Sequence, residues 1–141
     1  MLWLVACAGH AAASERPSVV ALAILIVLAG LMGAGGIALA AAAAHMAPGA
    51  GLDSAAYMLL FHAVAVLGGA ALMQQSVLWR PLALFVLAAW VLGAALFSGD
   101  IAMRAFAGHR LFAMAAPFGG IILIVAWLAL AAAAIGALLR S

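Results

Sequence analysis

The segment VVALAILIVLAGLMGAGGIALAAAAA (residues 19–44) carries no charged side chain over a length sufficient to cross a bilayer. A helix needs about 20 apolar residues to span about 30 Å of hydrocarbon. Further segments meet this criterion at about residues 55–73, 81–101 and 111–139, and none has a charge in its middle. A continuation of the third helix to Phe106 is left open. We therefore predict an all-α, polytopic membrane protein with four transmembrane helices.

The composition excludes a water-soluble domain. Of the 141 residues, 72% are hydrophobic and 6% are charged, whereas a soluble domain carries about 25% charged residues. So few charges could not cover the surface of the chain in water, and we expect the lipid bilayer to surround it. The formal net charge of +2 comes from dispersed arginines. We therefore predict no nucleic-acid partner, because such a face needs clustered cations.

The connections between the predicted spans are short, and short connections place consecutive helices antiparallel. We therefore predict an up-down-up-down bundle over residues 18–141, preceded by a short tail at residues 1–17. That tail holds the one cysteine of the chain, Cys7, so an internal disulfide is excluded. The residues before Cys7 are similar to a bacterial lipidation motif but include no basic residue, which leaves lipidation and processing of the tail open.

Arginine positions bear on the orientation of the predicted bundle. An even number of spans puts both termini on one side of the membrane. Arg16, Arg80 and Arg140 lie on that side, and Arg104 and Arg110 lie on the other. The positive-inside rule therefore favours cytoplasmic termini, by three arginines against two.

Helix starts are indicated by residues that tolerate or cap a first turn. Pro17 and Pro81 are each expected in a first turn, where a proline costs no hydrogen bond. Asp53 or Ser54 is expected to cap the second helix. These positions support the division of the chain into spans.

Small residues recur at helical spacing within the predicted spans. In lipid, close approach of backbones is a main source of packing energy, and small side chains permit it. We predict helix contacts at Gly36 and Ala40 of the first helix, Gly69 of the second and Gly93 of the third. Each lies on a small-residue face that should point into the bundle.

Two tryptophans fall near the middle of neighbouring antiparallel spans. Trp90 lies in the third span and Trp127 in the fourth, so we expect them at similar depth. Interfacial anchoring does not explain tryptophans at this depth. The sequence leaves open whether the two rings contact each other or fill the bundle separately.

Polar residues gather toward one membrane face when the chain is traced up and down. The candidate ligand or proton cluster consists of His45, His62, Ser98, Asp100 and Arg104. The first member ends the first helix, and the last two are four residues apart and are expected to pair. Ionisable groups within a span are costly unless paired, which makes them functional candidates.

His62 is the most informative member, because it should lie about 12 Å inside the second helix at 1.5 Å per residue. It shares a helical face with Met58 and Gly69, so we predict that it points into the bundle. A hydrogen-bonded bridge between helices and a ligand-binding or proton-transfer role both remain open.

A metal site is a further alternative. His45, His62 and Met58 are the candidates, because imidazole and thioether ligands together suit copper. No tight ligand motif occurs, and haem would need a histidine deeper in the span or a pair of histidines. We predict no cofactor.

We also predict no enzyme activity, because the sequence has no Gly-x-Ser-x-Gly motif, no phosphate loop and no paired carboxylates.

Short motifs in matching order resemble the domain-of-unknown-function 423 family. They are AAHM (43–46), FHAVA (61–65), LFSGD (96–100) and APFGG (116–120). The resemblance implies a small, four-helix inner membrane protein of bacteria, with a related mitochondrial transmembrane protein in eukaryotes. It implies no reaction. The chain departs from the family pattern in Asp100, where the family has a serine, in fewer glycines at the end of the first helix, and in the extra tail.

Two functional hypotheses follow. The first is a structural or accessory protein that packs against itself as a homo-oligomer or against a larger membrane complex. The second is a membrane protein that handles a ligand, a metal or protons through the polar cluster, above all His45, His62 and Asp100.

Overall fold

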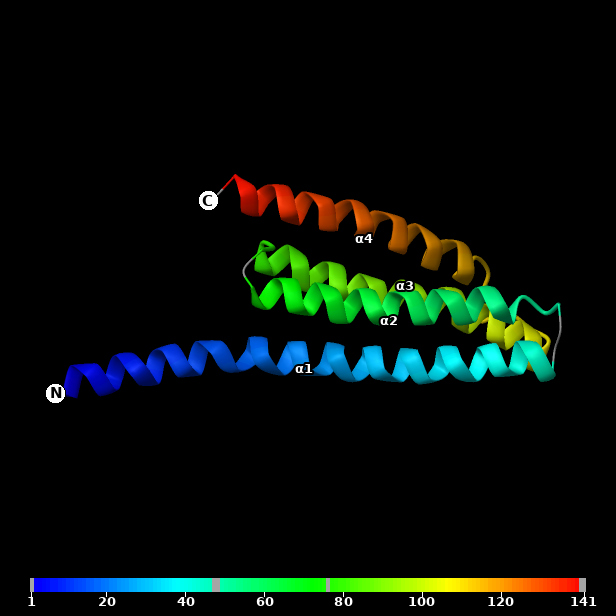
Figure 1. Cartoon of the computed structure of the whole chain (residues 1–141), viewed down its shortest axis with the longest axis horizontal. Helices are drawn as coiled ribbons and strands as arrows, with labels where there is room; N and C mark the ends of the chain where they lie inside the picture. Colours follow the sequence, from blue (N-terminus) through cyan, green and yellow to red (C-terminus); the bar gives the residue numbers. More distant parts are fainter. Residues whose placement is uncertain (1, 47–48, 76, 140–141) are drawn as a thin grey trace.

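The structure, a computed structural model, describes residues 2–46, 49–75 and 77–139, with side chains from residue 19 onward. The chain forms helices α1 (Leu2–His45), α2 (Leu52–Gln74), α3 (Arg80–Ala107) and α4 (Ala115–Leu138), and no strand among these residues (Figure 1). Successive helices run in opposite directions, and α1 begins at the same end at which α4 ends. The predicted all-α, up-down-up-down bundle is confirmed.

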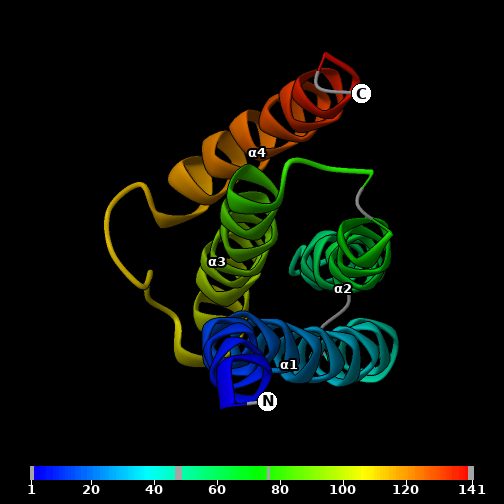
Figure 2. The same ribbon diagram turned by 90° about the vertical axis from the view of Figure 1, so that its left-hand side faces the viewer.

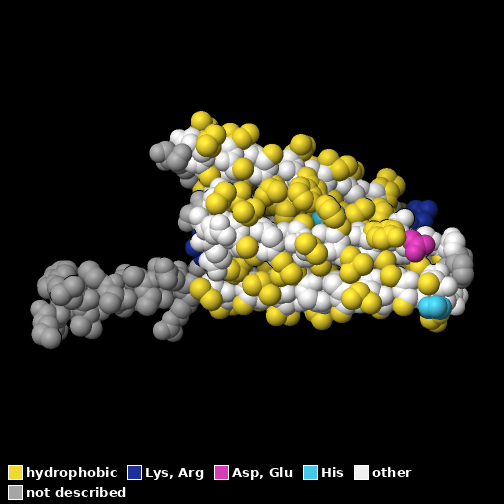
Figure 3. All heavy atoms as spheres, viewed as in Figure 1, with side chains coloured by type: hydrophobic (Ala, Val, Ile, Leu, Met, Phe, Trp, Pro, Cys, Tyr) yellow, Lys and Arg dark blue, Asp and Glu magenta, His cyan; other side chains and the backbone are white. Residues whose placement is uncertain are grey.

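All four helices are long and apolar enough to cross a membrane, with Val19–His45 as the spanning part of α1. Large apolar side chains are exposed along every helix. In the space-filling view, hydrophobic side chains cover the flank of the bundle, and most charged and histidine side chains gather at one end (Figure 3). The chain is therefore a multi-pass membrane protein in contact with lipid.

The predicted first span agrees with Val19–His45, but the helix that contains it starts earlier. α1 begins at Leu2, so helical backbone passes through Pro17 instead of starting there. The residues before Pro17 are rich in alanine and leucine, which favour helix strongly enough to extend it. The side chains of Cys7 and Arg16 are not described, and Arg140 lies outside the described residues. The predictions that rest on them stay predictions.

The connection between α3 and α4 is later in the chain than predicted. α3 continues to Ala107, which agrees with the extension to Phe106 that the sequence left open, and α4 begins at Ala115 instead of residue 111. Gly108 and Met114 both have a left-handed φ of 73°, which ends one helix and precedes the other. Apolar content alone does not mark these turns, because residues 111–114 are as apolar as the helix that follows.

The predicted cap of α2 is also wrong. The helix begins at Leu52, before Asp53 and Ser54, and Gly51 occupies the cap position with no side-chain hydrogen bond. Gly51 has a φ of 77°, a conformation that glycine adopts without a steric penalty. Asp53 instead lies in the first turn, where a carboxylate favours the helix dipole.

α3 is the central helix of the bundle. It packs against α1, α2 and α4, and α1 also packs along α2. Viewed along the helices, α1 lies beside α2 and α3, and α4 lies on the opposite side of α3 (Figure 2). Among the described residues, no Cα of α4 comes within 8 Å of a Cα of α2. The backbones of α2 and α4 therefore do not meet, and we call this side of the bundle, which side chains alone bridge, the open side.

Glycines mark the closest helix contacts. A Cβ added to Gly36 would lie 2.7 Å from Leu60 of α2, and one added to Gly69 would lie 2.5 Å from Leu87 of α3. Gly93 of α3 meets Gly119 of α4 backbone to backbone. Ala40, proposed with them, is partly buried on α1.

Candidate functional site

His62 lies inside the bundle, with 3% of its surface exposed, so the prediction that it points inward is confirmed. Its Nδ1 lies 2.9 Å from the carbonyl oxygen of Met58, one turn earlier on α2. Because a carbonyl oxygen only accepts, the proton of the ring is on Nδ1. This bond fixes the rotation of the imidazole against its own helix.

The second nitrogen of the ring joins α2 to α4. The indole Nε1–H of Trp127 donates to His62 Nε2 at 3.3 Å. An indole nitrogen only donates, so Nε2 accepts and the ring is neutral in this arrangement. Both nitrogens of His62 are therefore engaged by protein groups, and the second bond crosses the gap between helices whose backbones do not meet.

Aromatic rings surround His62 near the middle of α2. Trp90 and Trp127 contact each other with centroids 4.5 Å apart, which is one of the two arrangements that the sequence left open. The ring centroids of Phe61 and Trp127 lie 5.8 Å apart, and those of His62 and Trp90 lie 6.4 Å apart. The Nε1 of Trp90 is buried and has no hydrogen-bond partner among the described residues. The indole of Trp127 therefore forms a hydrogen bond, whereas the indole of Trp90 contributes packing alone.

Ser98 joins α3 to α2. Its hydroxyl donates to the carbonyl oxygen of Ala55 at 2.9 Å, and both residues are buried. A serine in a transmembrane helix commonly contributes such an interhelical bond. The role visible here is structural.

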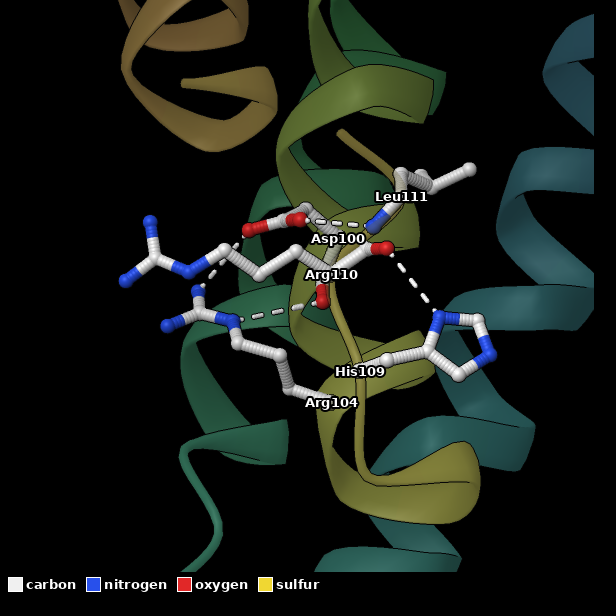
Figure 4. Close-up of polar contacts among 5 residues, drawn as sticks. All are labelled: Asp100, Arg104, His109, Arg110 and Leu111. Carbon is white, nitrogen blue, oxygen red and sulfur yellow. Dashed lines mark hydrogen bonds and ion pairs between the residues drawn. The ribbon is translucent and has the colours of Figure 1, made fainter. Parts of the chain in front are cut away.

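Asp100 organises the end of α3 and the loop that follows (Figure 4). Its Oδ2 lies 3.1 Å from a guanidinium nitrogen of Arg104, so the predicted i,i+4 ion pair is confirmed. The Nε–H of Arg104 also donates to the carbonyl oxygen of Asp100 at 3.4 Å. The other carboxylate oxygen accepts the backbone N–H of Leu111 at 3.0 Å. A buried carboxylate thus has both oxygens satisfied and ties the α3–α4 loop to α3.

The predicted cluster separates into independent contacts. His45 is exposed at the end of α1, and no hydrogen bond or ion pair joins it to the other four candidates. Within the described part of the chain, no three His, Cys, Asp or Glu side chains lie close enough to share a metal ion. The predicted lack of a cofactor, with copper and haem as its alternatives, and the predicted lack of enzyme activity stay predictions.

Sequence reasoning missed two partners in these contacts. It placed Trp127 at the right depth but did not identify its indole as the donor to His62. The backbone N–H of Leu111 gave no signal, because the residue was assigned to the fourth helix. The partnership of Trp127 and His62 could have been found by comparing the expected depths of polar side chains on all helices, including helices that do not follow each other in the sequence.

The model of the protein family of unknown function DUF423 matches residues 39–120, more than half of the chain. The chain belongs to the DUF423 family. The matched region of this DUF423 protein includes all five candidate cluster residues and ends before Trp127. The hydrogen bond between His62 and Trp127 therefore pairs a residue inside the matched region with one beyond it. No curated protein and no solved structure was found to be similar to the chain.

Proposed function

We propose that this protein is an accessory membrane module, which packs against itself or a larger membrane complex and performs no reaction of its own. The observation that carries the proposal is the use of both ring nitrogens of His62 by Met58 and Trp127. A histidine that coordinates a ligand needs a ring nitrogen that protein groups do not already occupy. Here Nδ1 is held by Met58 within α2, and Nε2 is held by Trp127 of α4.

The open side of the bundle is the proposed docking surface. α4 buries a single stripe of small and apolar residues against α3, and its backbone does not reach α2. Phe61 and Trp127 line the opening and are 59% and 39% exposed. Aromatic side chains at such a gap would gain dispersion contacts from an additional helix.

Cysteine cross-linking in membranes tests the docking surface. Cys7 is the only cysteine, so Cys7→Ala gives a background for single sites. Phe61→Cys probes the open side. Ile37→Cys is the matched control, because it is 65% exposed, lies at similar depth and belongs to α1 on the far side of the bundle.

We expect Phe61→Cys to cross-link to a second copy or to a co-purifying chain, and Ile37→Cys not to do so. If neither site cross-links and native mass spectrometry finds a monomer without another chain, the accessory role is wrong. His62→Ala should lower stability by about 1 kcal/mol and remove no bound ligand. Loss of a stoichiometric ligand or of a pH-dependent response would instead favour the second hypothesis.

The proposal places the protein in the bacterial inner membrane with the start of α1 and the end of α4 in the cytoplasm. Support comes from the family resemblance and from the positive-inside count. Alkaline phosphatase fused after α4 is active only outside the cytoplasm, so we expect an inactive fusion. An active fusion would reverse the orientation.

A further inference from the structure

A cavity of about 400 Å³ lies where the end of α3, the α3–α4 loop and the first turns of α4 meet. Its charged part is formed by Asp100, Arg104 and Arg110, and the rest of the lining is apolar: Phe97, Ala116, Pro117 and Gly120. Small-molecule sites in proteins commonly measure about 300–1,000 Å³. The volume is therefore sufficient for a ligand head group.

The charged and the apolar lining residues of this cavity lie at different depths in the membrane. Phe97 precedes Arg104 by two turns of α3, about 10 Å toward the middle of the membrane at 1.5 Å per residue. Gly120 likewise lies deeper in the membrane than the loop that holds Arg110. The cavity is therefore charged at the membrane face and apolar further in.

The cavity carries an excess of positive charge. Both oxygens of the Asp100 carboxylate are engaged, one by Arg104 and one by the backbone N–H of Leu111. No ion pair involves Arg110 among the described residues. The guanidinium groups of Arg104 and Arg110 point to the same side (Figure 4). Two guanidinium groups against one carboxylate leave one positive charge for a ligand.

The donor set matches a phosphate group. A guanidinium presents a planar fork of N–H donors that pairs with two phosphate oxygens, and it is more weakly hydrated than an ammonium. α4 begins at this cavity with no acidic residue in its first turn and no side-chain cap, so its dipole adds to the positive potential. The apolar inner lining offers no hydrogen bond to a free ion, but it can pack against an acyl chain.

We propose that this cavity binds an anionic phospholipid, with its phosphate against Arg104 and Arg110 and an acyl chain along Phe97 and Gly120. Asp100 is a positioning residue, because it orients Arg104 and, through Leu111, holds the loop that carries Arg110. The site does not depend on the proposed accessory function, since it lies on the α3–α4 side and not at the α2–α4 opening.

Lipid binding to the purified full chain tests the site by native mass spectrometry. Phosphatidylglycerol and phosphatidylcholine with identical acyl chains are titrated separately, and inorganic phosphate is added as competitor. Arg110→Gln removes the unpaired cation from an exposed loop position. Arg80→Gln is the control, because it removes an exposed arginine at the opposite end of the bundle. Gly120→Leu fills the inner part of the cavity at a position where an added Cβ meets nothing within 4 Å.

We expect the wild type to prefer phosphatidylglycerol about tenfold, because phosphatidylcholine has the same phosphate but adds a trimethylammonium cation beside the uncompensated guanidinium. Arg110→Gln should abolish most of this preference, Arg80→Gln should keep it, and Gly120→Leu should weaken both lipids. Equal binding of the two lipids by the wild type, or an unchanged preference in Arg110→Gln, would overturn the proposal. Displacement by inorganic phosphate without an effect of Gly120→Leu would identify a free-anion site and overturn the lipid assignment.

Discussion

Helix α4 is held in two different ways, by α3 through backbone contact and by α2 through side chains alone. Toward α3, a Cβ added to Gly119 would lie 2.7 Å from the carbonyl oxygen of Gly93. Toward α2, no described Cα lies within 8 Å, and Trp127 makes the contact by reaching Phe61 and His62. The α3–α4 contact therefore depends on close packing of backbones. The α2–α4 contact depends on one hydrogen bond and on ring contacts of Trp127 with Phe61 and His62.

The difference shows which forces act inside a bilayer. Lipid tails are as apolar as the helices, so burial of apolar surface drives association weakly, and close packing at small residues contributes most. A hydrogen bond between transmembrane helices averages about 0.6 kcal/mol and reaches about 1–2 kcal/mol. We therefore expect the α3–α4 contact to decide whether α4 docks, and the α2–α4 contact to decide its orientation.

The largest effect is expected from Gly119→Ala. The added Cβ would meet backbone atoms of α3, which cannot move aside as a flexible side chain does. Overpacking of this kind costs about 1–3 kcal/mol, and we expect the upper part of that range. Thermal unfolding in detergent measures it. Gly120→Ala is the control, because its Cβ meets open space and should be neutral or stabilising by up to about 1 kcal/mol. Equal stability of the two variants would contradict the backbone contact.

Asp100→Ala should rank second, at about 2 kcal/mol, because it removes a charged acceptor from the backbone N–H of Leu111. The ion pair adds less, since the Arg104 side chain is 43% exposed and solvent weakens such pairs. Asp100→Asn should cost less than Asp100→Ala. Asp53→Ala, at an exposed position in the first turn of α2, should cost only about 0.5 kcal/mol through the helix dipole. A loss of similar size at Asp53 would mean that buried hydrogen bonding is not the cause.

Trp127→Phe isolates the α2–α4 hydrogen bond, because it keeps an aromatic ring but leaves His62 Nε2 without a donor. We expect a loss of about 1 kcal/mol in the free energy of unfolding. The same substitution in a His62→Ala background is the control, because the acceptor is already absent there. Trp127→Phe should cost less in that background, since only ring volume is lost. An equal loss in both backgrounds would assign the stabilisation to ring volume instead of the bond.

Ser98→Ala should give the smallest loss, about 0.5 kcal/mol, measured by the same unfolding assay. The bond to Ala55 joins α2 and α3, whose backbones already pack along each other. The helix contact therefore persists without it. A loss larger than that of Trp127→Phe would break the distinction between the contact that crosses a gap and the contact that supplements close packing.

Much of the polar geometry follows from one-dimensional spacing. Asp100 and Arg104 pair because i and i+4 share a helix face, and His62 points inward because it lies on the face of Gly69. The partner of His62 could not be obtained this way. Trp127 lies on a helix that is not a sequence neighbour of α2, and its approach depends on the tilt and rotation of α4. Likewise, Leu111 reaches Asp100 only because α4 begins at Ala115, after a turn that apolar composition does not mark.

The sequence by itself determined that four apolar helices cross a membrane in alternation, because hydrocarbon admits only long apolar helices and short loops reverse their direction. Only the tertiary structure decided that α3 is central, that the bundle is open between α2 and α4, and that Arg110 shares a cavity with Arg104. The physical reason is that helix rotation and tilt depend on where small residues allow backbones to meet. A sequence shows which small residues could lie at a helix contact, but it does not show which residue of another helix each of them contacts.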